Sequence, residues 1–285
     1  MGAILRSVRD WRFDPDQNGG KMRLRDYKNV HSHYPSPAMA TPLRIVEVDK
    51  LKTACSTCSL HELCLPAGLS PSELKSMDRM IDIRRSLKRG DYVFRAGASL
   101  HALYAIRTGF MKSCVLHEDG REQVAGFHMM GDLIGMDAIG TDQHLCDAVV
   151  LEDSEVCEIP LKSLELLSRE IPSLQQHFHR IMSREIARDY GVMLLLGSMR
   201  AEERLAVFLL NLSQRFAARG YSSTEFHLRM TREEIGSYLG LKLETVSRTL
   251  SQFQSQGLIA VQNKHLRILK IDSLRELVGQ HGCRA

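Results

Sequence analysis

The chain has 285 residues, of which 44% are hydrophobic and 25% charged, and a formal net charge of +4. This length favours two domains with separate cores, and the composition is typical of globular proteins and not of disordered or fibrous ones. Uninterrupted apolar runs such as residues 192–196 are too short to cross a bilayer, and charges interrupt any signal peptide near the start. We therefore expect a cytoplasmic protein with no membrane partner.

Residues 1–50 mix charged side chains with the pair Gly19-Gly20 and prolines, and they show no sustained apolar period. This composition predicts a poorly ordered extension before the first domain. At the other end, residues 231–285 carry eight Lys or Arg and five Asp or Glu, a net charge of +3. A mildly basic C-terminal module suits a DNA binder that depends on a few placed contacts.

Three of the seven cysteines are clustered, with the spacing C-x2-C-x5-C. They are Cys55, Cys58 and Cys64, and the other four are Cys114, Cys146, Cys157 and Cys283. A reducing compartment disfavours disulfides, and thiolates are soft ligands that suit iron–sulfur clusters, zinc or Cu(I). A cubane cluster normally needs four cysteines, so a fourth would have to come from elsewhere. The spacing alone fits a cluster and a structural zinc site equally.

Between residues 84 and 160 glycine recurs at short intervals, and β-forming stretches such as residues 92–94 and 103–106 lie between the glycines. Short strands at this spacing predict a β-roll or barrel. We expect this roll, with the cysteine segment, to form a sensor domain over residues 51–171.

After Pro172 the apolar period changes to 3.6, which predicts a long helix over residues 172–199. One face of this helix carries Phe178, Met182, Ile186, Asp189 and Met193. The face could pack on the helix's own barrel, but the length and the narrow stripe favour a seam between two protomers. We therefore predict a dimerisation helix and a homodimer.

A capping-box pattern at Thr231-Arg-Glu-Glu234 predicts the start of a short helix, which Gly240 would end. A second helix is expected from about residue 243 to 256. Residues 258–261 and 266–269 flank a polar tetrapeptide, which predicts a hairpin wing. Residues 200–285 are thus expected to form a winged helix-turn-helix domain.

The second helix has two different faces. Leu243, Val246, Leu250 and Phe253 make the apolar side, and Glu244, Ser247, Arg248 and Ser251 line another side near the N-terminal end. Arginine can bind guanine in bidentate fashion and glutamate can accept from cytosine, so this side suits the major groove of double-stranded DNA. The alternative is a merely solvated surface helix, but cap, turn, helix and wing occur in the order of a DNA-reading unit.

Taken together, these segments resemble the FNR branch of the CRP/FNR regulators over roughly residues 52–280. The stretches that carry the resemblance are residues 55–66, 103–109, 126–128, 131–135, 156–160, 201–205 and 244–248. The resemblance implies an α+β fold with a cyclic-nucleotide-binding-like β-roll, a long dimerisation helix and a C-terminal winged helix-turn-helix. It also implies that Cys157 is the fourth ligand of an oxygen-labile [4Fe–4S] cluster, and that Cys114, Cys146 and Cys283 lie outside the ligand set.

The same resemblance implies how the protein acts. Cluster-bearing dimers of this branch bind a TTGAT-type palindrome and recruit RNA polymerase to switch genes for anaerobic life, which assigns DNA contacts to Glu244, Ser247 and Arg248. The polymerase-contacting loops correspond loosely to residues 117–121 and to the surroundings of Tyr221. Met136 and Cys146-Asp147 replace the Glu and the Arg-Ser pair with which the other branch holds a cyclic nucleotide, so we expect no such ligand.

Two rival sensors remain open, a regulator stapled by zinc and a thiol-redox regulator without metal. An enzyme that uses a cluster is a third rival, but the chain has no phosphate loop or nucleophile elbow, and we expect no enzymatic activity. Asp189 is the one charged residue in the helix stripe. We hypothesise that it faces its own copy and weakens the cluster-free dimer, unless Arg188 neutralises it.

Overall fold

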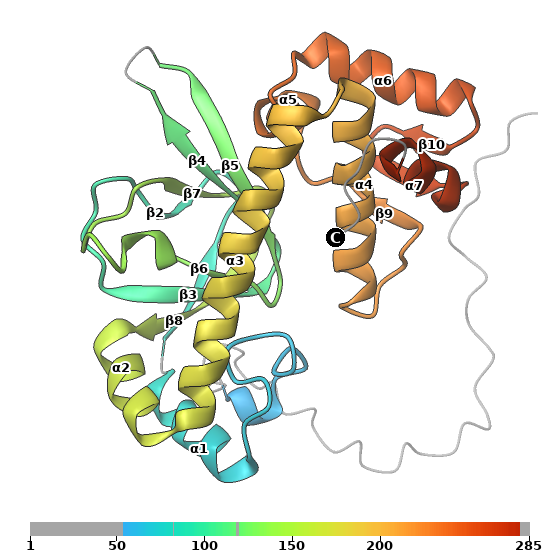
Figure 1. Ribbon diagram of the computed structural model, residues 1–285. Coiled ribbons are helices and arrows are strands. Elements are labelled where there is room, and N and C mark those ends of the chain that lie inside the picture. Colours follow the sequence, from blue (N-terminus) through green and yellow to red (C-terminus); the bar gives the residue numbers. More distant parts are fainter. Residues whose placement is uncertain (1–53, 82, 118–119, 280–285) are drawn as a thin grey trace, which may run out of the picture. The chain divides into compact units, whose positions relative to one another are not determined.

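The structure is a computed structural model that describes residues 54–279 apart from Asp82, Glu118 and Asp119 (Figure 1). The expected extension at residues 1–50 and Cys283 lie outside the described residues. Within the described part, no helix is both long enough and apolar enough to cross a membrane.

Two four-stranded antiparallel sheets form the predicted β-roll. Their strand orders are β1-β8-β3-β6 and β2-β7-β4-β5. The strands are β1 Ile83–Leu87, β2 Tyr92–Phe94, β3 Ala102–Thr108, β4 Phe110–Leu116, β5 Glu122–Met129, β6 Leu133–Ile134, β7 Asp147–Val150 and β8 Ser154–Pro160. Alternate residues of both sheets, among them Ile106 and Met111, meet in one buried core. The predicted fold of this part is confirmed.

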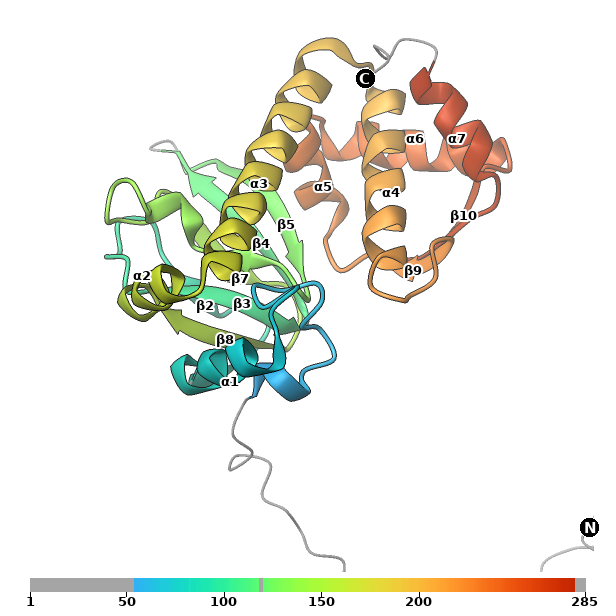
Figure 2. The same cartoon turned by 60° about the horizontal axis from the view of Figure 1, so that its bottom comes forward.

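Helices gather on the first sheet beside β8 (Figures 1 and 2). They are the 3-10 turn η2 Cys55–Thr57, α1 Pro71–Met80, α2 Leu161–Glu170 and α3 Pro172–Ser198. Ser70 and Glu73 form a capping box that starts α1, because each satisfies a backbone N–H of the other. One apolar cluster joins Met77 of α1, Leu164 of α2 and Leu174 of α3 to Ile159 of β8.

The C-terminal part is a winged helix-turn-helix, as predicted. It comprises α4 Ala201–Ala217, β9 Glu225–His227, α5 Arg232–Leu239, α6 Leu243–Ser255, β10 Ile259–Gln262, β11 His265–Ile268 and α7 Ile271–Gly279. The strands form one sheet in the order β10-β11-β9. Leu209, Val246 and Leu266 are among the side chains that the helices and the wing bury together.

Arg204 on α4 connects the end of α3 to α5, the first helix of the helix-turn-helix, by hydrogen bonds. Its guanidinium donates to the backbone carbonyls of Leu196, Met199 and Leu239 at 2.8, 2.9 and 3.0 Å. The first two carbonyls lie at the end of α3, and the third belongs to the last residue of α5. Since carbonyls at helix ends lack intrahelical partners, one side chain satisfies both ends and fixes their spacing.

Candidate functional site

The first helix of the helix-turn-helix, α5, starts and ends where its sequence dictates. Thr231 Oγ1 accepts from Glu234 N at 3.1 Å, and Glu234 Oε2 accepts from Thr231 N at 2.6 Å. Gly240 ends α5 at a φ of 62°, which glycine adopts without strain. Gly236, which no local sequence pattern singles out, stands where a Cβ would lie 2.5 Å from the Leu241 carbonyl oxygen. Only glycine lets the turn approach α5 so closely.

The second helix, α6, has the buried side that its periodicity predicts. Val246, Leu250 and Phe253 are each at most 1% exposed. Leu243 was expected on this side, but it is 45% exposed. It stands in the first turn, where it lines a surface pocket instead of packing beneath α6.

The four predicted base-reading residues share one side of α6. Glu244, Arg248 and Ser251 are exposed, and Ser247 is half-buried. The Ser247 hydroxyl accepts from Arg232 at 3.3 Å, and the Ser251 hydroxyl donates to the Ser247 carbonyl at 3.0 Å. The two serines are therefore engaged within the reading unit, whereas the long side chains of Glu244 and Arg248 extend into solvent.

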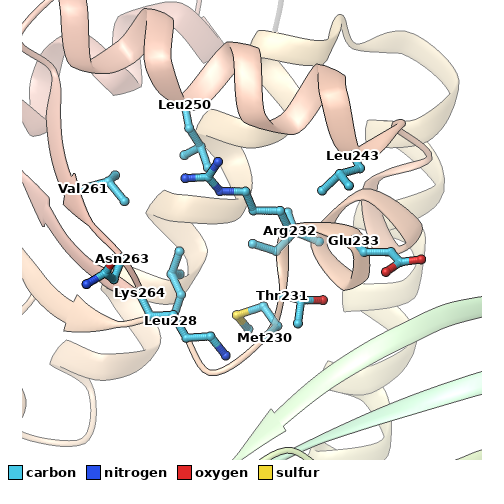
Figure 3. Close-up of a pocket in the computed structure, with 11 residues that line it drawn as sticks. Leu228, Met230, Thr231, Arg232, Glu233, Leu243, Leu250, Val261, Asn263 and Lys264 are labelled. Carbon is cyan, nitrogen blue, oxygen red and sulfur yellow. The ribbon is translucent and has the colours of Figure 1, made fainter.

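A pocket of about 410 Å³ opens between α5, α6 and the β10–β11 turn (Figure 3). Leu228, Met230 and Leu250 give it apolar walls, and Figure 3 shows Arg232 extending across it toward Leu250. Lys264 lies at the turn of the wing and donates to the Arg229 carbonyl at 3.3 Å. Two cations beside an exposed helix face suit contacts to the phosphates of a nucleic acid.

The cysteine segment is held by turns and by α1. Cys58 N donates to the Cys55 carbonyl at 3.2 Å, and Cys64 N donates to the Leu60 carbonyl at 3.0 Å. Ser56 donates to the Asp78 carboxylate of α1 from its backbone N at 3.1 Å and from its hydroxyl at 2.5 Å. These bonds fix where the three cysteines lie on the first sheet.

Cys157 comes to the same place from β8. It stands opposite Arg84 of β1 and Ala105 of β3. Cys55 and Cys157 are each 8% exposed and belong to one buried cluster, against which Cys64 also packs. The fold thus brings together cysteines that are far apart in the sequence.

The four thiols act on one another electrostatically. Burial, with smaller contributions from Cys157 and Cys58, raises the pKa of Cys64 to about 12. Burial and Cys58 likewise raise the pKa of Cys157 to about 11, and burial with the other three cysteines raises that of Cys55. Within the described residues, no three His, Cys, Asp or Glu side chains are arranged as metal ligands. Burial therefore favours the neutral thiol at Cys55, Cys64 and Cys157.

Two other cysteines lie apart from this group. Cys114 is buried in β4, where burial and then Glu122 raise the pKa of its thiol to about 12. Cys146 donates to Asp137 Oδ2 at 3.6 Å, and burial and that carboxylate raise its pKa to about 12. Both thiols face carboxylates.

The long helix α3 leaves an apolar stripe uncovered. Phe178 packs partly against the roll, whereas Ile186, Tyr190, Met193 and Leu194 are 53–64% exposed. The periodicity of the sequence did not predict Tyr190 and Leu194 as part of this stripe. Arg188 pairs with Glu185, and exposed Asp189 makes no ion pair among the described residues. The stripe extends over two turns and suits another apolar helix.

Comparisons with known proteins identify the family. The Crp-like helix-turn-helix domain family matches residues 203–277, and the cyclic nucleotide-binding domain family matches residues 84–170. Over 225 residues the chain is 48% identical to the fumarate and nitrate reduction regulatory protein of Escherichia coli strain K12, which covers 79% of this chain and 90% of that protein. The chain belongs to the CRP/FNR family of transcription regulators.

A second curated relative and a solved structure show the same family relationship. The transcriptional regulatory protein btr of Bordetella pertussis is 46% identical over 229 residues, 80% of this chain and 95% of that protein. The structure of FixK2 from Bradyrhizobium japonicum covers 71% of this chain and 98% of its own, with a TM-score of 0.65 and 29% identity. As a CRP/FNR regulator, the chain binds DNA through its helix-turn-helix and acts as a dimer.

Proposed function

We propose that this chain is an oxygen-responsive regulator of genes for anaerobic growth, with a [4Fe–4S] cluster held by Cys55, Cys58, Cys64 and Cys157. The observation that carries the proposal is the shared core: thiols from two remote segments lie in one apolar cluster with Leu174 of α3. The name of the Escherichia coli relative, a fumarate and nitrate reduction regulator, supports the same function.

The donor set fits such a group. All four side chains are thiols, the ligands that iron–sulfur clusters take, and their thiolates lie close enough to affect one another. When bound, an iron–sulfur cluster supplies iron that dioxygen oxidises, which is the chemistry that an oxygen sensor needs. Cys55, Cys64 and Cys157 would bind as thiolates, so loading must displace the protons that burial holds on them.

Contacts between the cysteine segment and α3 would carry the signal to the dimer seam. The ring of His177, on α3, hydrogen-bonds the backbone of Cys64. One turn earlier, the Ser173 hydroxyl donates to Glu73 of α1 at 2.9 Å. A change in the position of the cysteine segment therefore moves side chains that contact the first turns of α3. We propose that the face of the same helix that carries Phe178, Met182, Ile186, Asp189 and Met193 pairs with a second copy, chiefly through its exposed part from Ile186 onward.

For DNA recognition we propose that Glu244, Ser247, Arg248 and Ser251 face the major groove of a TTGAT-type half-site. Their common side on α6 and the exposure of Glu244 and Arg248 support this. Arg232 and Lys264 would then contact phosphates beside the groove. A two-fold dimer would read two half-sites about 34 Å apart.

We further propose that the roll binds no cyclic nucleotide. Asp147 Oδ1 already accepts from Ala96 N at 2.7 Å, and Asp137 Oδ2 accepts from Leu145 N at 2.7 Å. A phosphate in this region would face carboxylates and would find these amides already bonded.

RNA polymerase is a proposed partner through the tip of the β4–β5 hairpin, residues 117–121, and through Tyr221. Glu118 and Asp119 of that tip lie outside the described residues, and Tyr221 is 54% exposed. A Tyr221→Ala protein should then lose transcription activation in vitro while its operator affinity is unchanged.

Anaerobic purification tests the proposal. We expect brown protein whose visible absorption decays in air and which contains iron and sulfide in equal amounts, near four of each per chain. Its dimers should bind the palindrome before exposure to air and not afterwards. Colourless zinc-loaded protein would favour the zinc-stapled regulator. Metal-free protein that responds to thiol oxidants would favour the thiol-redox regulator.

A further inference from the structure

The sheet beside Cys157 contains an arginine with an unused hydrogen-bond donor. Arg107 lies two residues beyond Ala105 on β3, where the β3–β8 register shifts, and its positive charge acts on the Cys157 thiol. The side chain as a whole is 32% exposed, but its Nη1 atom is buried and has no hydrogen-bond partner in the part of the chain that the structure describes.

The nearest carboxylate does not satisfy this donor. Glu155 Oε2 lies 3.9 Å from Arg107 Nη1, beyond hydrogen-bond distance, and it lies equally far from Arg84 Nη1. The Glu155 carboxylate thus lies between two guanidinium groups, and the one of Arg107 acts on Cys157. A buried donor without an acceptor costs free energy, so Arg107 Nη1 has a hydrogen bond to offer to an acceptor beside Cys157.

We propose that Arg107 is a positioning residue of the iron–sulfur site, whose buried Nη1 donates to the Cys157 thiolate or to an acceptor sulfur beside it. This inference rests on the proposed function. A guanidinium is charged at every working pH, so Arg107 offsets part of the negative charge that four thiolates bring. Hydrogen bonds to sulfur and nearby charge are the means by which a protein tunes such a site.

Arg85 offers a matched control on the same sheet. It neighbours Arg84 on β1, so its side chain points to the opposite face from the residue that pairs with Cys157. It is 35% exposed, and its Nη1 lies 3.9 Å from Glu158, nearly the values of Arg107. Arg85→Met therefore removes the same charge from the same sheet without touching the cysteine face.

The test compares the full-length wild type, Arg107→Met, Arg107→Lys and Arg85→Met, all loaded under nitrogen. The measurements are iron and sulfide content, the midpoint potential, and the rate at which visible absorption decays in air. We expect Arg107→Met to decay roughly tenfold faster, with a lower midpoint potential, because a positive charge that stabilises the more negative, reduced state is lost. Arg107→Lys should recover part of the difference, and Arg85→Met should match the wild type.

A merely structural role for Arg107 gives a different pattern. If Arg107 were merely structural, the metal-free Arg107→Met protein would be less stable than the wild type. We expect instead that urea unfolding gives the same free energy of unfolding for the two metal-free proteins, because the substitution removes an unpaired donor. Equal decay rates and potentials for Arg107→Met and Arg85→Met overturn the inference, as does a metal-free Arg107→Met protein that is destabilised. A wild type without iron or sulfide overturns the proposed function itself.

Discussion

Lys112 and Glu234 form an ion pair, with Nζ 3.1 Å from Oε1, that joins β4 of the roll to the capping residue of α5. Lys112 also pairs with Glu122 of β5, and its side chain is only 10% exposed. Beside the pair, the Ser237 hydroxyl of α5 donates to the Glu122 carbonyl at 3.0 Å and accepts from Val124 N at 2.8 Å. The first helix of the reading unit is thus bound to the roll.

We expect Lys112→Met to lower the free energy of unfolding of the metal-free protein by about 2 kcal/mol. The substitution leaves Glu234 without its cation, and breaking a fully buried pair costs roughly 3–5 kcal/mol. The loss should be smaller here because Glu122 is 43% exposed. Urea titration followed by far-UV circular dichroism measures it.

The matched control for Lys112 is Lys88→Met. Lys88 pairs with Asp153 at 2.7 Å, but the two side chains are 79% and 63% exposed. An exposed pair contributes little, so this variant should unfold within about 0.5 kcal/mol of the wild type. Equal losses for the two variants would contradict the role assigned to Lys112.

Glu234 makes stability depend on pH in the acid range. Burial acts to raise its pKa, but the Thr231 N–H and the Lys112 ammonium outweigh burial and hold the pKa below the ordinary 4.5. A carboxylate whose pKa is depressed on folding adds stability above its unfolded pKa and loses it as pH falls through the folded pKa. Glu234→Gln removes the charge but retains an oxygen for the cap.

The wild type should therefore be more stable than Glu234→Gln at neutral pH, and the difference should shrink as pH falls below 4.5. Urea unfolding of both proteins from pH 6 down to about 3 measures the difference, in which the other titrating groups cancel. A difference that grows toward acid would reverse the assigned sign.

Arg248 gives a prediction about sequence reading. If its exposed side chain binds a guanine edge, Arg248→Ala should cost about 1–3 kcal/mol on the consensus palindrome and relax preference at that one base pair. Competition binding with single-base operator variants at fixed salt measures this. Gln252→Ala, an exposed residue in the second half of α6, is the control. A uniform loss across all sequences would make Arg248 a phosphate contact instead.

Short sequence patterns predicted the helix-turn-helix, whereas contacts between residues far apart in the sequence could not be predicted. The Thr231–Glu234 cap spans four residues, so the sequence contains all of it. The Lys112–Glu234 pair and the position of Arg107 near Cys157 depend on which strands become neighbours, and no local pattern specifies that. The resemblance supplied Cys157 for the same reason: its distance from the cysteine segment in sequence hides their proximity.

The long helix α3 shows the limit of periodicity. Its stripe was predicted as one continuous face, but the first turns pack on the roll through Phe178 and Ile181. The exposed apolar side chains then start at Ile186, and they include Tyr190 and Leu194. A hydrophobic period does not tell which turns the chain itself covers.

Asp189 stands at the edge of this exposed stripe and gives the last prediction. Arg188 pairs with Glu185 and also lies within the field of Asp189, but Asp189 forms no ion pair among the described residues, so a dimer seam has to accommodate its charge. Asp189→Asn keeps the shape and removes the charge. In metal-free protein under air we expect the dimer dissociation constant to fall about tenfold, since like charges near a seam repel by about 1.4 kcal/mol or more.

Sedimentation equilibrium of wild type, Asp189→Asn and Arg184→Gln measures the effect. Arg184 is exposed on the opposite side of α3 and should leave dimerisation unchanged. The metal-free Asp189→Asn protein could have the same dimer dissociation constant as the wild type and still dimerise only after anaerobic cluster loading. In that case repulsion at this residue does not hold the metal-free subunits apart. The weakness of that dimer would then arise in the first turns of α3, where Cys64 and His177 meet.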